Sequence, residues 1–266
     1  MTIMLLGLPT DINSSFLRGA ANAPPIIRAA LWSDRGNLAA ENGMELGHDI
    51  DLRDAGDLDL QESPDDVERI RARITEIAKG GDRPLCLGGD HFVTFPVIAG
   101  LYAVHGPLNI LHFDAHPDLY DDFEGNPLSH ASPFARIMER GMAKRLVQVG
   151  IRTMNAHCRA QAARYGVDVI EMRDFALDAV PVLDGPLYVS LDLDALDPSH
   201  MPGVAHPEPG GLSVRDVLRC LDRQTAPIVG ADIVEFNPAA DQSPLSAVTA
   251  AKFVKEIAAF MTRNAA

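Results

Sequence analysis

Short apolar runs that alternate with longer amphipathic segments are the feature that most limits the possible folds of this chain of 266 residues. Residues 108–113 and 187–191 have the length and composition of buried strands, and residues 63–79 have the apolar spacing of a helix with Ser63 as its N-cap. Strands that alternate with helices predict βαβ units and a mostly parallel sheet with helices on both faces. The predicted strands are 3–6, 84–87, 108–113, 146–149, 167–170, 187–191 and 228–236, and the predicted helices are 24–31, 63–79, 133–140, 156–165, 213–224 and 247–262.

No linker, repeat or low-complexity segment interrupts this pattern. We therefore expect an α/β protein with three αβα layers and a mostly parallel central sheet, folded as one domain over residues 1–266.

The charge balance narrows the range of partners. Asp and Glu number 37 against 23 Lys and Arg, which gives a formal net charge of −14. An acidic surface disfavours nucleic acid and anionic membranes, and it suits either a cationic substrate or an ordinary acidic enzyme. No apolar stretch is long enough for a transmembrane helix, the N-terminus lacks a signal-peptide pattern, and the three cysteines are scattered. We expect a cytoplasmic protein that binds neither nucleic acid nor membrane.

Polar residues follow four of the predicted strands, at residues 88–91, 114–118, 192–197 and 235–238. Ligands of open α/β sheets bind at the carboxyl ends of strands, so these segments are expected to meet. Asp197, which precedes Pro198, is interpreted instead as a turn residue or an outer partner of the site.

Two of these segments carry ligand-type residues at alternate positions. Asp114, His116 and Asp118 would point to one side of an extended chain. Asp192 and Asp194 would do the same and would repel each other unless a cation lay between them. Six candidate ligands, four of them carboxylates, exceed what one ion takes from a protein and predict two divalent ions with bridging carboxylates. The candidate ligands are His91, Asp114, His116, Asp118, Asp192 and Asp194.

Residues 88–91 (GGDH), 114–118 (DAHPD) and 190–198 (SLDLDALDP) resemble the three metal-binding motifs of the ureohydrolase family, which contains arginase, agmatinase, guanidinobutyrase and formiminoglutamase. The resemblance extends to residues 7–24, 148–152 and 235–241 and so covers nearly the whole chain. It implies an arginase- and deacetylase-like fold and a hydrolase that cleaves the C–N bond of a guanidino compound with a metal-bound hydroxide, giving urea and an amine. It also implies two Mn²⁺ ions, or Ni²⁺ as in some relatives, and a homotrimer or homohexamer.

The resemblance implies individual roles as well. Asp114 and Asp192 would bridge the two ions, and Asp118 would also accept a hydrogen bond from the nucleophile. Glu235 would bind the guanidinium group through charge-assisted hydrogen bonds. His130 would be the proton shuttle, although Ala131 stands where the family usually has glycine, and the alternative for His130 is an ordinary loop histidine.

Substrate choice is predicted from the loops. Tyr120 resembles agmatinase-like members more than arginase, and the aspartate that arginase uses near the substrate amino group is missing after residues 150–152. The acids of residues 121–124 would attract a cationic tail such as that of agmatine, or form a solvated acidic loop. Arg152 or Arg159 could instead bind a carboxylate tail. The alternatives are guanidinobutyrase, arginase or formiminoglutamase activity, a deacetylase-like amidohydrolase, and a non-catalytic metal binder.

Overall fold

The computed structural model describes residues 1–265 and contains an eight-stranded sheet in the order β2-β1-β3-β8-β7-β4-β5-β6. Every neighbouring pair in it is parallel, which confirms the predicted α/β class. The strands are β1 (Ile3–Leu8), β2 (Leu52–Asp57), β3 (Arg83–Gly88), β4 (Leu108–Phe113), β5 (Ala143–Ile151), β6 (Asp168–Glu171), β7 (Leu187–Asp192) and β8 (Ile228–Val234). The helices are α1 (Ala23–Leu31), α2 (Asp66–Lys79), α3 (Thr94–His105), α4 (Pro133–Glu139), α5 (Ala156–Tyr165), α6 (Val214–Asp222) and α7 (Leu245–Arg263).

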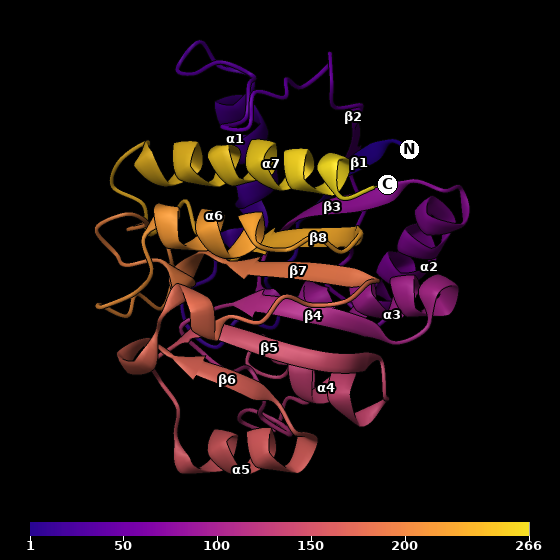
Figure 1. Ribbon diagram of the computed structural model, residues 1–266. Coiled ribbons are helices and arrows are strands. Elements are labelled where there is room, and N and C mark those ends of the chain that lie inside the picture. The colour runs from indigo at the N-terminus through magenta and orange to yellow at the C-terminus, as the bar shows by residue number, and fades with distance from the viewer. Residues whose placement is uncertain (266) are drawn as a thin grey trace.

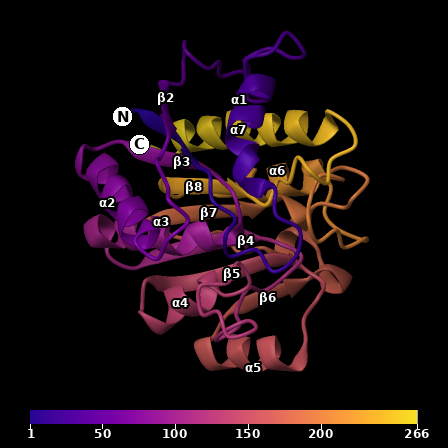
Figure 2. The same cartoon turned by 180° about the vertical axis from the view of Figure 1, so that it is seen from behind.

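Helices cover both faces of the sheet and create two apolar cores (Figures 1 and 2). Successive side chains of a strand point to opposite faces, so Leu5 of β1 packs into one core and Leu6 into the other. Helices α1, α6 and α7 contribute to the first core, and α2, α3 and α4 contribute to the second. The central strands are buried on both sides, which explains their continuous apolar sequences.

Two elements were not predicted from the sequence. Helix α3 is apolar on all sides, because every residue from Thr94 to Leu101 is buried, so it lacks the period of an amphipathic helix. Strand β2 lies at the edge of the sheet and is mostly exposed and polar, so it lacks the composition of a buried strand.

The start of α2 also differs from the prediction. The helix begins at Asp66 rather than near Ser63, and its N-cap residue is Asp65, whose side chain makes no capping hydrogen bond. The Asp66 carboxylate instead accepts hydrogen bonds from the backbone N–H groups of Gln61 and Ser63, which folds the preceding loop back onto the helix.

In residues 1–265, no helix is long and apolar enough to cross a membrane. The single domain over residues 1–266 stays a prediction, and Ala266 lies outside the described residues.

Candidate metal centre

The four polar segments meet because the strands that precede them are neighbours. Strands β3, β8, β7 and β4 are adjacent at the middle of the sheet and run in the same direction. Their carboxyl ends therefore lie at one edge and place His91, Asp114, Asp192 and Glu235 together. The turn after β3 depends on Gly89, because a Cβ atom there would lie 1.8 Å from the carbonyl oxygen of Thr10.

One cluster surrounds His91, whose side chain is fully buried. Its Nδ1 atom lies 3.2 Å from Asp114 Oδ2, 3.0 Å from Asp118 Oδ2 and 3.1 Å from Asp192 Oδ2. Among the described residues Nδ1 has no partner with hydrogen-bond geometry, whereas Nε2 lies 3.0 Å from Ser190 Oγ. One imidazole nitrogen and three carboxylate oxygens thus face a common centre, which is a donor set that suits a divalent cation.

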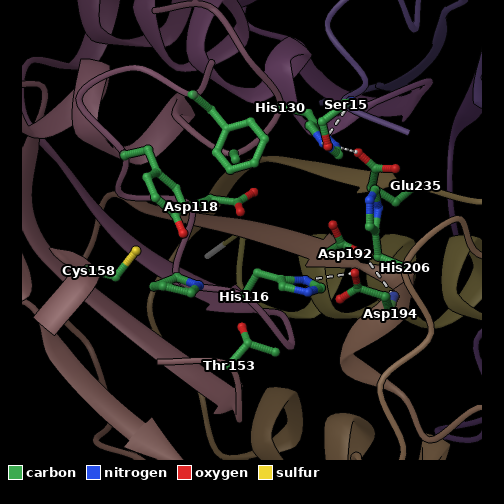
Figure 3. A pocket seen from close by; sticks show the side chains of 14 residues that line it. Ser15, His116, Asp118, His130, Thr153, Cys158, Asp192, Asp194, His206 and Glu235 are labelled. Atoms are coloured by element: carbon green, nitrogen blue, oxygen red, sulfur yellow. Dashed lines mark hydrogen bonds and ion pairs between the residues drawn. The ribbon is translucent and has the colours of Figure 1, made fainter. Parts of the chain in front are cut away.

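A second cluster surrounds His116 and shares Asp114 with the first. The Nδ1 atom of His116 lies 3.0 Å from Asp194 Oδ2 (Figure 3). The same atom lies 3.4 Å from Asp114 Oδ1. The Asp192 carboxylate adjoins this cluster, because its Oδ1 accepts a hydrogen bond of 2.8 Å from the backbone N–H of Asp194. The two oxygens of Asp114 face different clusters, as a bridging carboxylate requires.

The electrostatics of these carboxylates also fit cations. Burial, together with Asp194 and Asp114, raises the pKa of Asp192 well above its usual value. Burial and the Asp114 charge raise the pKa of Asp194 to about 6. Burial alone would lower the pKa of His91, but the three carboxylates raise it well above its usual range. The carboxylates repel one another when all are ionised, and the imidazole beside them is stabilised in its protonated form. Both effects show that a positive charge is stable at this position.

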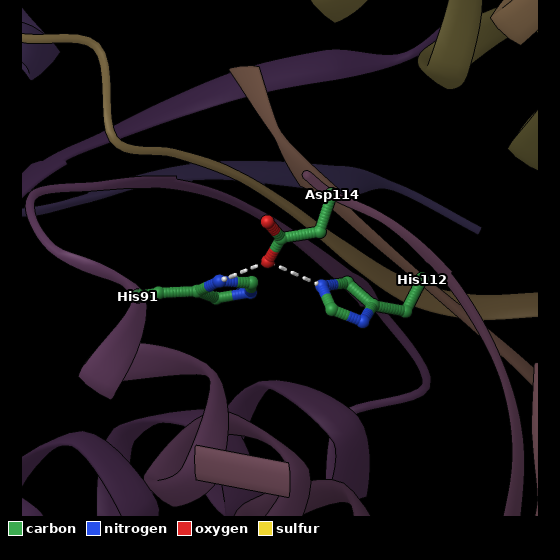
Figure 4. Close-up of side chains that lie close together, drawn as sticks. All are labelled: His91, His112 and Asp114. Atoms are coloured by element: carbon green, nitrogen blue, oxygen red, sulfur yellow. Dashed lines mark hydrogen bonds and ion pairs between the residues drawn. The ribbon is translucent and has the colours of Figure 1, made fainter. Parts of the chain in front are cut away.

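His112 contacts the first cluster and was not among the residues predicted from the sequence. Its Nε2 lies 2.9 Å from Asp114 Oδ2, on the opposite side of this oxygen from His91 (Figure 4). Its Nδ1 accepts a hydrogen bond of 3.1 Å from Gln148 Nε2, so the ring proton lies on Nε2 and is donated to Asp114. The signal was present in the sequence, because His112 continues the alternating pattern of Asp114 and His116 two residues upstream into β4.

The other side of His91 rests on a buried polar network that was also missed. The Ser190 hydroxyl contacts His91 Nε2 and donates a hydrogen bond of 2.7 Å to Asp232 Oδ1. Thr94 and Tyr188 donate to the other oxygen of Asp232. Outer partners of this kind orient metal-binding histidines. Ser190 and Asp232 lie inside β7 and β8, where no strand-end rule would find them.

Glu235 and His130 lie side by side next to the two clusters. Glu235 Oε1 accepts hydrogen bonds from the backbone N–H of His91 at 2.8 Å and from His130 Nδ1 at 2.9 Å. Among residues 1–265, no donor contacts Glu235 Oε2. Burial would raise the pKa of Glu235, but His130 and the His91 N–H lower it, so the side chain is a carboxylate.

The backbone is strained at two of the predicted site residues. Asp118 has a φ of +49° and Glu235 a φ of +64°, in the left-handed region that residues with a Cβ atom seldom adopt. Each such residue costs about 1–3 kcal/mol, a cost that is tolerated mainly where function fixes the side chain.

A pocket opens from these groups to the surface (Figure 3). Among the described residues, no Lys or Arg lines it. His206, from the loop between β7 and α6, was missed by the sequence reasoning and lies with its ring centre 5.2 Å from that of His130. The lining residues are Ser15, His116, Pro117, Asp118, Tyr120, Phe123, His130, Ala131, Thr153, Cys158, Asp192, Asp194, His206 and Glu235.

The acids of residues 121–124 do not line this pocket; in that segment only Phe123 does. The Asp121 carboxylate accepts a hydrogen bond from Gln161, and that of Asp122 accepts one from the N–H of Gly125. These contacts favour the structural interpretation of the acidic loop over the recruitment of a cationic tail.

The two arginines considered for a carboxylate tail are also engaged elsewhere. Arg152 donates hydrogen bonds to the backbone carbonyls of Asp194 and Glu208, and so holds two loops together. Arg159 pairs with Glu171 at 2.9 Å. Asp197 accepts hydrogen bonds from the N–H groups of Ser199, Gly210 and Gly211, as expected for a turn residue.

Comparisons with known proteins agree with this architecture. Residues 1–259 match the family described as "Arginase family". The chain is 49 % identical to arginase 1, mitochondrial, of Arabidopsis thaliana over 97 % of this chain and 81 % of the relative. The solved structure of arginase from Medicago truncatula superposes with a TM-score of 0.94 at 45 % identity, covering 98 % of this chain and 87 % of that one. Agmatinase of Bacillus subtilis is 32 % identical over 96 % of this chain and 90 % of its own length.

These identities correct one prediction. The chain is more similar to the plant arginases, at 45–49 % identity, than to the agmatinases, at 29–32 %. The prediction of a closer relation to agmatinase was wrong, because it depended on Tyr120 and one missing aspartate, whereas the similarity extends over almost the whole chain.

Proposed function

Because the chain belongs to the arginase family and is a metal-dependent ureohydrolase, we propose that its substrate is L-arginine, which it hydrolyses to urea and L-ornithine. The observation that carries this proposal is the identity of 45–49 % to proteins named arginase over at least 97 % of the chain. Intact candidate ligands and an available Glu235 oxygen support the chemistry.

We assign two divalent ions to the two clusters. His91, Asp114, Asp118 and Asp192 would hold one ion, and His116, Asp114, Asp192 and Asp194 the other, with Asp114 and Asp192 shared. The buried Nδ1 of His91, which faces three carboxylates without a hydrogen bond, supports this assignment. Such ions act as Lewis acids and lower the pKa of water, which supplies a nucleophile at neutral pH. Manganese is the expected metal, with nickel as the alternative.

The protein groups next to the clusters would bind and orient the substrate. Glu235 Oε2 is free to accept hydrogen bonds from a guanidinium ion, and a carboxylate matches the geometry of that group. Its other oxygen is held by His91 and His130, so the carboxylate is fixed before the substrate arrives. Asp118 lines the same pocket and would accept a hydrogen bond from the attacking water. His130 would move a proton into or out of the pocket.

Agmatine is the second candidate substrate. The pocket lining contains no Lys or Arg, so within the described residues no cation is available to pair with the α-carboxylate of arginine. Neutral donors such as Tyr120 and Thr153 would have to bind that carboxylate. Agmatine lacks the carboxylate and would not need them.

The test is urea release from L-arginine and agmatine by protein loaded separately with Mn²⁺ and Ni²⁺. The proposal requires L-arginine to have the higher kcat/KM; a higher value for agmatine would reverse the assignment. Glu235→Gln is the matched variant, since it keeps the shape of the side chain and removes its charge. We expect about 10²-fold or greater loss of kcat/KM, as is usual when a charged contact to the reacting group is removed.

Two further properties stay predictions. The first plant relatives carry "mitochondrial" in their names, whereas the sequence predicts a cytoplasmic location here. The predicted trimer or hexamer can be measured by light scattering of the purified protein.

A further inference from the structure

The N-terminal loop of residues 11–21 reaches the pocket and is fixed at its base. The buried Asp11 carboxylate accepts hydrogen bonds from the N–H groups of Gly19 at 2.6 Å and Ala21 at 3.1 Å, and from Arg18 Nε at 2.7 Å. One carboxylate thus closes the loop on itself. Ser15 lies at its tip, is exposed and lines the pocket.

A second anchor joins this loop to the segment that carries His130. The backbone N–H of His130 donates to the carbonyl oxygen of Asn13 at 3.1 Å, and the N–H of Asn13 donates to Asp90 Oδ2 at 2.9 Å. Asn126 donates from Nδ2 to Asn13 Oδ1 at 3.0 Å. The position of Ser15 relative to the His130 ring is therefore set from both sides.

Ser15 makes two contacts with one nitrogen of that ring. Its backbone N–H donates to His130 Nε2 at 3.1 Å, and its hydroxyl Oγ lies 2.8 Å from the same atom (Figure 3). The other nitrogen, Nδ1, lies 2.9 Å from Glu235 Oε1. A nitrogen that accepts from a backbone N–H carries no proton, so the neutral ring must carry its proton on Nδ1 and donate it to Glu235.

The ring lies between the interior and solvent. His130 is only 8 % exposed, whereas Ser15 is exposed at the rim of the pocket. Nδ1 faces the buried Glu235, and Nε2 faces the Ser15 hydroxyl. The hydroxyl is both a donor and an acceptor, so it can exchange a proton with Nε2 in either direction.

We propose that Ser15 is a positioning residue that orients the His130 ring and carries protons between its Nε2 atom and solvent. This inference rests on the proposed function. Hydrolysis of a guanidinium ion to urea and an alkylammonium ion consumes one water and releases no net proton, because both hydrogens of the water end on the departing nitrogen. A proton that leaves the pocket when the nucleophile forms must therefore be replaced when the amine departs.

Protons and charge balance in each step of this proton relay. In the outward direction, the imidazolium gives its Nε2 proton to the Ser15 oxygen while the Ser15 hydroxyl gives its own proton to a solvent water. The inward step is the reverse. Ser15 is unchanged after either step. The ring has its Nδ1–H form after the outward step and is an imidazolium after the inward step, and it becomes Nδ1–H again when it gives a proton to the departing amine.

The charged and titratable groups around the ring act in opposite directions. Glu235, Asp90 and Asp118 favour the imidazolium, whereas burial and the neighbouring His206 ring disfavour it. The Ser15 N–H adds a contact that only the unprotonated Nε2 can accept. Both forms of the ring therefore have partners in place, as a group that alternates between them requires.

The kinetic test compares Ser15→Ala, Ser15→Thr and Ser14→Ala. Ser14 is the matched control, because its hydroxyl lies 3.4 Å from Asp90 and makes no contact with His130. A full acid–base group contributes roughly 10²–10⁴-fold, and water can partly replace a relay hydroxyl, so we expect Ser15→Ala to lower kcat about tenfold. KM should stay within about twofold of the wild-type value, since the Glu235 contact is intact. Small buffers such as imidazole should restore kcat in Ser15→Ala, and Ser15→Thr should keep the wild-type rate.

A wild-type kcat without buffer dependence in Ser15→Ala, or an equal loss in Ser14→Ala, would overturn the relay. Nitrogen-15 NMR of the His130 ring in the wild-type protein needs no substrate and separates this proposal from the proposed function. The neutral ring is expected in the Nδ1–H form. An Nε2–H form would refute the orientation even if the enzyme hydrolyses L-arginine, and wild-type inactivity toward L-arginine would refute the substrate while leaving the NMR prediction standing.

Discussion

Replacement of His112 by phenylalanine tests whether the outer contacts hold the metal site in place. The phenyl ring keeps the packing against Phe134, whose ring centre lies 4.0 Å from that of His112. It removes the Nε2–H group that contacts Asp114 Oδ2 at 2.9 Å. Asp114 then keeps its own atoms but loses a donor that orients it toward both clusters, so we expect weaker metal binding.

The size of the effect follows from the type of bond that is lost. A hydrogen bond to a charged group contributes about 1.5–3 kcal/mol, and about 1.4 kcal/mol corresponds to a tenfold change in affinity. The predicted loss is therefore about 10- to 100-fold in metal affinity, which agrees with the range for outer partners of metal ligands. The pair is fully buried, so solvent does not screen this contact.

Competition with a chelator of known affinity measures the Mn²⁺ dissociation constant directly. His105→Phe is the control, because His105 is an exposed histidine at the end of α3, away from the site. At saturating metal, His112→Phe should regain most of the wild-type turnover. Unchanged metal affinity in His112→Phe, or equal weakening in His105→Phe, would refute the reasoning.

Three other predictions follow from the same site. Removal of metal should destabilise the protein, because Asp114, Asp192 and Asp194 then repel one another. Calorimetry should find a loss of about 2.7 kcal/mol for each ion removed, relative to metal at 100 times its Kd, and an unchanged Tm would contradict this. Gly89→Ala should lower the Tm strongly or prevent folding, since its Cβ would lie 1.8 Å from a backbone oxygen, whereas Gly36→Ala, with no atom within 4 Å, should be tolerated in the same melting assay. Burial lowers the pKa of His130, but Glu235 raises it to about 9. We therefore expect kcat to rise with pH through a step near 9, because the ring can accept a proton only when it is neutral. His130→Asn should abolish that step in the measured pH profile.

Much of the fold was predictable because most helices have one apolar face and the central strands are continuous apolar runs. The predicted bounds of β4 and α5 agree with the structure, since apolar runs and turn residues delimit both. Helix α3 has no polar face and β2 has little apolar surface, so neither leaves a periodic signal. Strand order could not be predicted, because the adjacency of β3 and β8 joins residues 146 positions apart, such as Leu85 and Ala231.

The site could be predicted only for the polar and charged side chains that come directly after a strand. His91, Asp114 and Asp192 meet as predicted, because parallel neighbouring strands must bring their carboxyl ends to one edge. Ser190 and Asp232 were missed because they lie within strands. The role of a polar residue there can be recognised only when its hydrogen-bond partner on the next strand is known. The pairing of residues Ser190 and Asp232 in the β7–β8 register is a property of the assembled sheet.

The acidic loop could not decide the substrate, for a different reason. The sequence shows only that these acids lie close along the chain to residues 114–118. The electrostatic field in the pocket depends instead on where each carboxylate points and on which groups already pair with it. Asp121 lies near Arg164 and accepts a hydrogen bond from Gln161, and Asp122 stabilises its own turn. The carboxylate that remains available on the guanidinium side is Glu235, and the walls beyond it are formed by neutral side chains such as Tyr120 and Thr153. Discrimination between L-arginine and agmatine must then depend on hydrogen bonds from neutral side chains to the end of the substrate far from the guanidinium group. Such bonds act over a shorter range than a charge and need a closer fit. Substitutions at Tyr120 and Thr153 should therefore change the KM values of the two substrates unequally.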